Sequence, residues 1–364
     1  MSLDITDLEL LIILQEKPMA NDSTLARLTG LSSPTVKRRI DRLYDVKAIE
    51  RIQALIDYEK IDLQVVSAFL QVSFEKLTRL SNILDKYPYI YYQVRSFGKK
   101  NGIHATFRIP EKGFPLLEQY LKKLISLDLL IDYTLINHED TIELRTKPRF
   151  IVYNSKANKW DFDFLKWVDV PTERLFRGIE EDIPTNHTQI PGLEELDLID
   201  IEILSILSLN SRIKNVDIIN HLSSEISPQR LSDRLRYLKK YFISNYRVYL
   251  NWDEIFNFQG YVFVCYCNDE VKKYFRVLLK YRPPPFETTF REFKEGFTIY
   301  VICPGKHMLD LINVLDSKVH VFDIYILDYK SSKRYNLKST SFDAIKKYWK
   351  FDSDFLLKEH LFKE

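Results

Sequence analysis

Two short stretches of the chain concentrate basic side chains in a pattern suited to binding nucleic acid. Residues 35–42 hold four basic side chains and one acidic one, and residues 229–240 hold five basic and one acidic. The whole chain of 364 residues has a formal net charge of only +2, so both stretches stand out. Cations neutralise backbone phosphates, and the planar arginine fork also bonds base edges. Both stretches are therefore candidate DNA-binding segments.

Each basic stretch has the periodicity of an amphipathic helix. The apolar stripe consists of Val36, Ile40 and Leu43 in the first stretch and of Leu231, Leu235 and Leu238 in the second. The outward positions, which we predict to contact DNA, are Thr35, Lys37, Arg38, Arg39 and Arg42, and then Gln229, Arg230, Arg234, Arg236, Lys239 and Lys240. Asp233 also faces outward. It could accept from a cytosine amino group, although we expect it to pair with Arg230 or Arg236 on its own helix.

The chain contains an internal repeat that is too long for a solenoid and indicates domain duplication. Residues 3–11 match residues 196–204, and residues 49–61 match residues 243–255. Each unit opens with three helical segments, the third of which starts with Ser-Pro at 33–34 or 227–228. In the first unit, Gly30 suits the tight turn before that third helix. The β-rich stretches 49–57 and 243–250 follow and predict a small wing hairpin in each unit. Each unit therefore begins as a winged helix-turn-helix.

The remainder of each unit changes to a strand and helix alternation. We predict strand, helix, strand, strand, helix and strand at 66–74, 75–87, 90–97, 103–109, 114–127 and 130–137 in the first unit. The second unit repeats this order at 261–267, 269–280, 286–293, 297–303, 306–315 and 319–327. This order is βαββαβ, a ferredoxin-like domain. The predicted fold class is α+β, with two winged helix-turn-helix and two ferredoxin-like domains.

The predicted domain boundaries follow the repeat. They are 1–62 and 63–140 for the first helix-turn-helix and ferredoxin-like domains, 141–195 for an extension, 196–256 and 257–330 for the second pair, and 331–364 for a C-terminal extension. The first extension holds several prolines, so we expect turns and extended runs in it. Its motif at 160–165 has an echo at 349–356, and both are rich in aromatic residues. We expect these aromatics to fix the extensions onto the domains, and a partner-docking peptide is the alternative.

This domain order resembles the Lrp/AsnC (feast/famine) family of transcription regulators. The resemblance is carried by Leu196–Leu204, by Asn210–Asn215 and by Ile226–Leu235, and in the first unit by Gly30–Val36 and Arg39–Leu43. Members of the family usually have one unit and dimerise through their ferredoxin-like domains, so the resemblance implies a pseudo-dimer within one chain that could self-associate further. We predict a sequence-specific regulator of transcription that binds double-stranded DNA at a pseudo-palindromic operator with unlike half-sites.

The resemblance also implies a site for a small-molecule effector. In the family, effectors such as amino acids bind near a loop with Gly and Asp after the second strand. The corresponding residues here are Gly98, Lys99, Lys100 and Asn101, which we name as the candidate ligand site; the second unit has Lys294-Glu295-Gly296. Both loops depart from the family pattern, and the basic first loop suits an anion better than an ammonium group. A plain hairpin turn is the alternative.

An enzyme is the alternative function, because siroheme decarboxylases resemble the same two-domain unit and can occur as fused copies. The polar groups available for it are Arg95, Lys99, Lys100 and His104, and Arg291, Lys294, Lys306 and His307 in the second unit. The His- and aromatic-rich loop of that family does not surround them, so we expect no enzymatic activity. A nucleoid-architectural protein, which binds DNA with little sequence preference, is a third candidate.

Composition argues against several other classes. The 9 glycines form neither G-x-G-x-x-G nor G-x-x-x-x-G-K-[ST], so the common nucleotide cradles are absent. Three cysteines do not make a disulfide framework, and the N-terminus has no signal pattern, so we expect a cytoplasmic protein. No apolar run is long enough to span a membrane. Cys265 and Cys267 share a strand face that Cys303 could approach, but buried core cysteines are the expectation. We therefore expect no metal and no cofactor.

Overall fold

The computed structural model describes residues 3–138, 143–154, 159–170 and 191–359. The chain divides into two compact units. Unit 1 comprises Met1–Glu50, His138–Asn186 and Leu250–Tyr329, and unit 2 comprises Arg51–Asn137, His187–Tyr249 and Lys330–Glu364. Unit 1 therefore contains the first helix-turn-helix and the second ferredoxin-like domain, and unit 2 contains the other two domains. The predicted turns and extended runs at 171–190 lie outside the described residues.

The first helix-turn-helix consists of α1 (Ile5–Glu16), α2 (Asp22–Thr29) and α3 (Ser33–Asp45). Side chains cap all three helices, because Asp4, Asn21 and Ser32 accept hydrogen bonds from the first-turn amides. Gly30 ends α2 in the left-handed conformation with a φ of 71°, which glycine adopts without strain. The predicted tight turn before the third helix is therefore present.

The second helix-turn-helix consists of α8 (Leu198–Leu207), α9 (Asn215–His221) and α10 (Pro228–Tyr241). Asp197 caps α8 with a capping box, as Asp4 does for α1. Ser227 caps α10 and Pro228 occupies its first turn. The predicted apolar stripe of α10 is buried at Leu231, Leu235 and Leu238.

The prediction of a separate wing hairpin in each unit is wrong. Each β-rich stretch forms one strand, β1 (Ile49–Ile56) and β9 (Ile243–Leu250), and these two strands pair with each other. Within unit 2 the Asp57 amide donates to the Phe242 carbonyl at 2.9 Å, and the Ser244 hydroxyl donates to the Leu55 carbonyl at 3.0 Å. The backbone N–H and C=O groups along one edge of each strand bond to the equivalent strand of the other repeat. Neither repeat therefore needs a second strand of its own to pair with them.

The first ferredoxin-like domain lies in unit 2 and has the predicted βαββαβ order. Its elements are β2 (Leu63–Gln71), α4 (Phe74–Lys86), β3 (Ile90–Gly98), β4 (Gly102–Pro110), α5 (Phe114–Ser126) and β5 (Asp132–His138). The strands are hydrogen-bonded in the order β5-β2-β4-β3. The core packs Val66, Ala68 and Leu70 of β2 with Leu80 and Leu84 of α4. Because successive side chains of a strand point to opposite faces, the residues between these three in β2 lie on the other face of the sheet.

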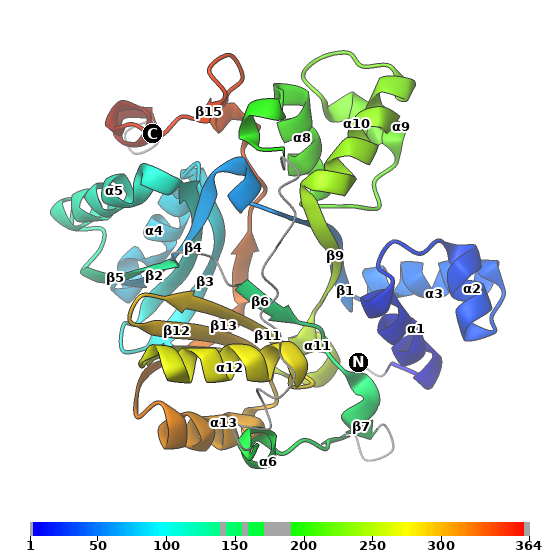
Figure 1. Cartoon of the computed structure of the whole chain (residues 1–364), viewed down its shortest axis with the longest axis horizontal. Helices are drawn as coiled ribbons and strands as arrows, with labels where there is room; N and C mark the ends of the chain where they lie inside the picture. Colours follow the sequence, from blue (N-terminus) through cyan, green and yellow to red (C-terminus); the bar gives the residue numbers. More distant parts are fainter. Residues whose placement is uncertain (1–2, 139–142, 155–158, 171–190, 360–364) are drawn as a thin grey trace. The chain divides into compact units, whose positions relative to one another are not determined.

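The second ferredoxin-like domain lies in unit 1, apart from the end of its last strand. Its elements are α11 (Trp252–Phe256), β10 (Gln259–Tyr266), α12 (Asp269–Tyr281), β11 (Glu287–Phe293), β12 (Gly296–Cys303), α13 (Gly305–Lys318) and β13 (Val321–Arg334). The strand order is β13-β10-β12-β11, and β6 (Glu143–Thr146) adds to β11 in antiparallel register. Figure 1 shows α12 running along β11 and β12, which it contacts.

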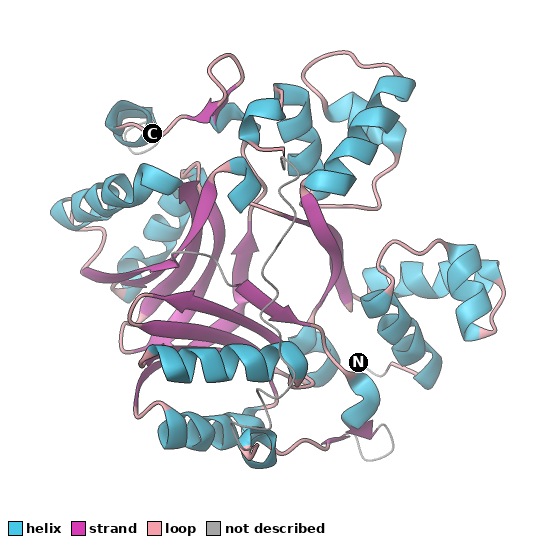
Figure 2. Ribbon diagram, viewed as in Figure 1, coloured by secondary structure: helices cyan, strands magenta, loops and turns pink. Residues whose placement is uncertain are grey.

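Each extension is fixed by aromatic side chains, as expected. The first contains β7 (Tyr153–Asn154), β8 (Lys159–Trp160) and α6 (Phe164–Val168), and the second contains β14 (Phe342–Asp343), β15 (Tyr348–Trp349) and a helical turn at Asp354–Glu359. In Figure 2 the described helices and strands of both extensions are short. Trp167 Nε1 donates to the Arg282 carbonyl at 2.6 Å, and Trp349 Nε1 donates to the Ile61 carbonyl at 2.6 Å. The first extension therefore packs on the second ferredoxin-like domain, and the second extension packs on the first, where the Phe351 ring centre lies 4.9 Å from that of Tyr89.

In the part of the chain that the structure describes, none of the helices combines the length and apolarity that a membrane crossing requires. The three cysteines do not meet. Cys265 pairs with Phe297 in the β10–β12 ladder, whereas Cys303 pairs with Gln259 at its other end. Burial raises the pKa of both Cys265 and Cys303, as expected of thiols in an apolar core.

Candidate functional site

The predicted DNA-binding residues lie on α3 and α10, the third helices of the two helix-turn-helix domains. Most are exposed, and Thr35, Arg39 and Arg234 are half-buried; the exposed ones are Lys37, Arg38, Arg42, Gln229, Arg230, Arg236, Lys239 and Lys240. The outward placement predicted from periodicity therefore holds for the exposed set. The half-buried arginines contact other helices.

Arg39 and Arg42 bind carboxylates of α1 and of its cap. Arg39 Nη1 lies 2.8 Å from Asp4 Oδ2 and 2.7 Å from Asp7 Oδ1, and Arg42 Nη1 lies 2.9 Å from Asp7 Oδ2. Asp7 is fully buried. These bonds tie α3 to the start of α1, so Arg39 is first of all a structural residue. Although desolvation raises the pKa of Asp4, the bonds from Arg39 and the Asp7 amide outweigh it and lower that pKa.

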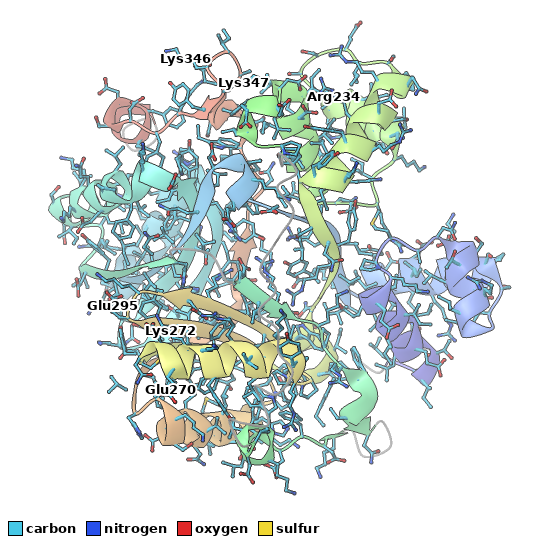
Figure 3. All side chains as sticks on the ribbon, viewed as in Figure 1. Arg234, Glu270, Lys272, Glu295, Lys346 and Lys347 are labelled. Carbon is cyan, nitrogen blue, oxygen red and sulfur yellow. The ribbon has the colours of Figure 1, made fainter. Side chains whose placement is uncertain are left out.

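Arg234 has the same role in the second helix-turn-helix, and Figure 3 labels it on α10. Its Nη2 lies 2.7 Å from Asp197 Oδ2, and its Nη1 lies 3.0 Å from Asp200 Oδ2. Asp200 is fully buried, and desolvation raises its pKa to about 6. The prediction that Arg234 contacts a base competes with these bonds, because a buried carboxylate that loses its arginine is strongly destabilised.

Asp233 takes part in pairs within its own helix, as expected. Arg236 Nη1 lies 3.1 Å from Asp233 Oδ1, and Gln229 Nε2 lies 3.4 Å from the same carboxylate. The cations of α3 and α10 that have no ion pair to a described residue include Lys37, Arg38 and Arg230. These three, rather than Arg39 or Arg234, are the cations best placed to meet phosphates.

The candidate ligand loop Gly98–Asn101 forms the turn between β3 and β4, and its polar groups bond within the domain. The Gly98 amide donates to Asn101 Oδ1 at 3.0 Å, and Lys100 forms an ion pair with Asp132. At Gly102, a Cβ would lie 2.2 Å from the Leu70 carbonyl oxygen, so glycine is required by close approach. This geometry favours the plain hairpin turn.

The polar groups named for the enzyme alternative are separated by the fold. Arg95 stacks over Phe74 and Phe97, 5.3 and 4.8 Å from their ring centres. Because Arg95 pairs with Ile103 in the ladder, it lies on the helix-covered face, and His104 lies on the other. In unit 1, His307 Nε2 lies 3.3 Å from the Trp160 carbonyl, and Arg291 pairs with Glu143 at 3.2 Å. His307 thus fixes the first extension.

A cluster that sequence reasoning missed occupies the second face of the first ferredoxin-like sheet. We call it the sheet cluster: Phe69, Tyr92, His104, Arg247, Tyr249 and Arg334. The His104 ring stacks on Phe69 with centres 4.7 Å apart. The Arg334 guanidinium lies 4.9 Å from the Tyr92 ring centre and 4.6 Å from that of Tyr249.

Most of the sheet cluster is buried, although it contains two arginines and a histidine. His104 is 4% exposed and Arg247 4% exposed. Its members come from β2, β3, β4, β9 and β13, which are far apart in sequence, so no local motif reveals it. The available signal was the alternation of β3 and β4, which places Tyr92, His104 and Thr106 on one face.

The comparisons with known proteins agree with an Lrp/AsnC-like architecture. A family model of the AsnC-type helix-turn-helix domain matches residues 3–44. The crystal structure of the siroheme decarboxylase NirDL has a similar fold, with a TM-score of 0.54 and 13% identity, over 98% of this chain and 97% of that chain. The structure of NirDL in co-complex with an iron-uroporphyrin III analogue gives a TM-score of 0.53 at 14% identity, over 92% and 94%.

An AsnC family transcriptional regulator from Agrobacterium tumefaciens is 24% identical over 41% of this chain and 97% of its own, with a TM-score of 0.35. No curated protein matches the chain. The tandem architecture of helix-turn-helix and βαββαβ domains is thus shared with NirDL along nearly its whole length.

Proposed function

We propose that the protein binds a polycarboxylate tetrapyrrole and removes carboxyl groups from it. This proposal differs from the expectation from sequence, which was a protein without enzymatic activity. The observation that carries this proposal is the similarity in fold to the siroheme decarboxylase NirDL over 98% of this chain. That similarity includes the fused tandem arrangement. Fold alone does not define a reaction, so the residues must also suit the substrate.

The sheet cluster suits a tetrapyrrole rimmed by carboxylates. Such a molecule has a flat apolar ring, which aromatic side chains bind, and a negative edge, which arginine binds through paired hydrogen bonds. Arg334 lies between the rings of Tyr92 and Tyr249, and Arg247 lies 5.4 Å from the Tyr249 ring centre. The cluster therefore combines the two chemistries on one sheet face.

His104 is the candidate proton donor of this proposal. Loss of carbon dioxide leaves a carbon atom that must take up a proton, and histidine exchanges protons near neutral pH. Its ring is held by stacking on Phe69 and lies 6.3 Å from the Tyr92 ring centre. A histidine held in place near the Tyr92 ring would deliver this proton to the carboxyl-bearing side chain of the bound tetrapyrrole.

The test is a titration of the full chain with iron uroporphyrin III, followed by incubation with siroheme. We expect a saturable shift of the tetrapyrrole absorbance and a product that has lost carboxyl groups by mass spectrometry. Arg334→Met should weaken binding about tenfold. His104→Gln should preserve binding and abolish product formation. Lys346→Met, at an exposed position of the same unit, is the control. Absence of any absorbance shift would overturn the proposal.

Binding of DNA is the second candidate function, and the match of residues 3–44 to the AsnC-type helix-turn-helix model favours it. Exposed Lys37, Arg38 and Arg230 would neutralise phosphates. Selection from random duplexes, with the affinity of the selected sequence measured at two salt concentrations, tests it. An enriched motif with two unlike half-sites supports a regulator. Salt-dependent binding without enrichment supports an architectural role instead.

A further inference from the structure

The C-terminal extension of unit 2 contains a hairpin rich in lysine. Residues 330–350 hold seven basic side chains and one acidic one, although the net charge of the whole chain is only +2. Part of this charge is used inside the unit, since Lys333 Nζ lies 2.8 Å from Asp85 Oδ2. The last cations of the stretch belong to the hairpin of β14 and β15 and to the residue after it; they are Lys346, Lys347 and Lys350. We call residues 342–349 the basic hairpin.

The base of the basic hairpin is fixed by packing. Phe342 pairs with Trp349 in antiparallel register, and the centres of their rings are 5.2 Å apart. Both side chains are buried. The Lys350 amide donates to the Ser341 carbonyl at 2.8 Å, which continues the pairing beyond the two strands. The base therefore gives the tip of the hairpin a defined position on unit 2.

The tip of the basic hairpin presents one apolar and one cationic side chain. Asp343 Oδ1 accepts hydrogen bonds from the amides of Ile345 and Lys346 at 3.0 and 2.9 Å, and this closes the turn. Ile345 is 94% exposed. Lys346 is also exposed, and its ammonium group forms no ion pair with a described residue. Both side chains are therefore accessible to a partner.

The basic hairpin packs against the second helix-turn-helix. Helix α8 contacts both β14 and α10, and Figure 1 shows α8 between β15 and α10. Lys347 Nζ donates to the carbonyl of Leu196, the residue before the Asp197 cap. Asp197 Oδ2 lies 2.7 Å from Arg234 Nη2 of α10. Adjacent residues at the start of α8 thus hold the hairpin and α10, and Figure 3 labels Lys346, Lys347 and Arg234 along one end of the unit.

The charge of this end of unit 2 fits a nucleic acid duplex. Arg230, Lys239 and Lys240 are exposed on α10, and a duplex bound there continues past the helix with a phosphate about every 1.7 Å of its axis. A lysine is a flexible point charge, so it can reach a flanking phosphate without exact positioning. An apolar side chain next to it can pack in the minor groove.

We propose that the basic hairpin is an additional DNA-binding element of the second helix-turn-helix. Lys346 contacts a backbone phosphate beside the bases bound by α10, and Ile345 packs in the adjoining minor groove. Lys347 is a positioning residue that fixes the hairpin to α8. The inference rests on DNA binding, the second candidate function, and is independent of tetrapyrrole binding. The basic hairpin thus takes the place of the predicted wing, since β9 forms no hairpin within its own repeat.

The first test measures the affinity of the full chain for a mixed-sequence duplex of about three helical turns at several salt concentrations. Lys346→Met should lower the slope of log K against log salt by about one. Ile345→Ser should weaken binding about threefold and leave the slope unchanged, because it removes an apolar contact. Arg79→Met removes an exposed cation of α4 in the same unit and should change neither quantity.

The outcomes separate the hairpin from the function on which it rests. A slope that Lys346→Met leaves unchanged, or that Arg79→Met lowers equally, would overturn the proposal. If Arg230→Ala lowers the slope and Lys346→Met does not, DNA binding stands and the hairpin contact is wrong. If the parent chain does not bind the duplex, both are wrong.

A second test detects the contact without a substitution. Lysines of the full chain are acetylated with a succinimidyl ester, and the modified positions are found by mass spectrometry. Saturating duplex should slow the modification of Lys346 about fivefold or more. It should not affect Lys122 of α5, whose side chain is 61% exposed.

Vesicles of phosphatidylcholine and phosphatidylserine form the comparison arm, because an exposed apolar residue beside lysines also suits an anionic membrane. Protection of Lys346 by duplex and not by vesicles supports the proposal. Protection by vesicles and not by duplex would contradict it, and so would equal modification of Lys346 with and without duplex.

Discussion

The two helix-turn-helix domains use the same ion-pair arrangement but complete it differently. In the first, both oxygens of buried Asp7 are bound by guanidinium groups, one from Arg39 and one from Arg42. In the second, Asp200 Oδ2 binds Arg234, and among the described residues Oδ1 has no hydrogen-bond partner. Tyr237 occupies the position that corresponds to Arg42.

This difference shows that one copy of a duplicated domain can keep the fold while it lacks one of the ion pairs of the other copy. The apolar stripe and the capping box are the same in both copies, so the fold of each is preserved. The second guanidinium is absent from the second copy, and among the described residues one oxygen of the buried Asp200 has no hydrogen-bond partner, which costs free energy. Burial, and next the negative charge of Asp197, raise the pKa of Asp200, although the Asp197 amide and Arg234 oppose them.

The largest expected effect comes from removing the single arginine of the second copy. Arg234→Met leaves buried Asp200 without a cation, and we expect a loss of about 3 kcal/mol in the stability of that domain. Arg39→Met should cost clearly less, because Arg42 still binds Asp7. Hydrogen exchange of the α8 and α1 amides in the full chain measures both. Equal losses would break the comparison.

The next prediction concerns pH. The folded pKa of Asp200 is about 6, above the ordinary value of 3.8, so the folded domain holds this proton more tightly than the unfolded chain. Its stability therefore rises as the pH falls from 7 towards 4 and is lower and constant above the folded pKa. Between pH 7 and pH 5 the opening constant of α8, relative to that of α1, should fall about tenfold. Asp200→Asn should remove this dependence, and a persistent dependence would contradict the assignment.

Exchanging the residues at positions 42 and 237 should make the stabilities of the two helix-turn-helix domains more alike. Tyr237→Arg supplies a second guanidinium next to Asp200, and we expect a gain of about 1 kcal/mol in the second domain and a weaker pH dependence. Arg42→Tyr should cost the first domain a similar or smaller amount, since the Arg42 side chain is 48% exposed. Urea titrations followed by exchange at α8 and α1 report each domain separately. A loss of stability in Tyr237→Arg would show that the tyrosine packing matters more.

The smallest expected effect concerns DNA. Arg38 in the first copy corresponds to Asp233 in the second, and both are exposed. Arg38→Ala should lower the salt slope of duplex binding by about one and leave α1 stable. Asp233→Ala should raise affinity slightly, because it frees Arg236. Filter binding at several salt concentrations measures both. A salt slope that neither variant changes would remove α3 and α10 from the DNA interface.

Sequence reasoning succeeded where the determinants are local. The third helices begin at the predicted Ser-Pro pairs, with Ser32 and Ser227 as their caps, because a cap needs only its own first turn. The two βαββαβ orders also follow from alternation and from turn residues. Asp233 pairs with Arg236 because the two are neighbours on one helix face.

Prediction from the sequence failed where the partner of a strand or side chain lies far along the chain. The partner of β1 is β9, and no pattern within either strand distinguishes a hairpin from pairing with the other repeat. Arg39 has the spacing of an outward cation, but Asp4, 35 positions away, binds it. His104 was expected in a strand, but its stacking on Phe69 depends on the ladder between β2 and β4.

The sequence by itself therefore determined the duplicated α+β architecture, the helix caps and the positions of the exposed cations, because periodicity and capping act over a few residues. Only the tertiary structure decided which arginines are held by carboxylates, which repeat each extension covers, and which rings and cations share the sheet cluster. These contacts depend on which surfaces, distant in the sequence, pack against each other and exclude water. A charge that is buried there needs a partner, and the local spacing of residues does not encode that partner.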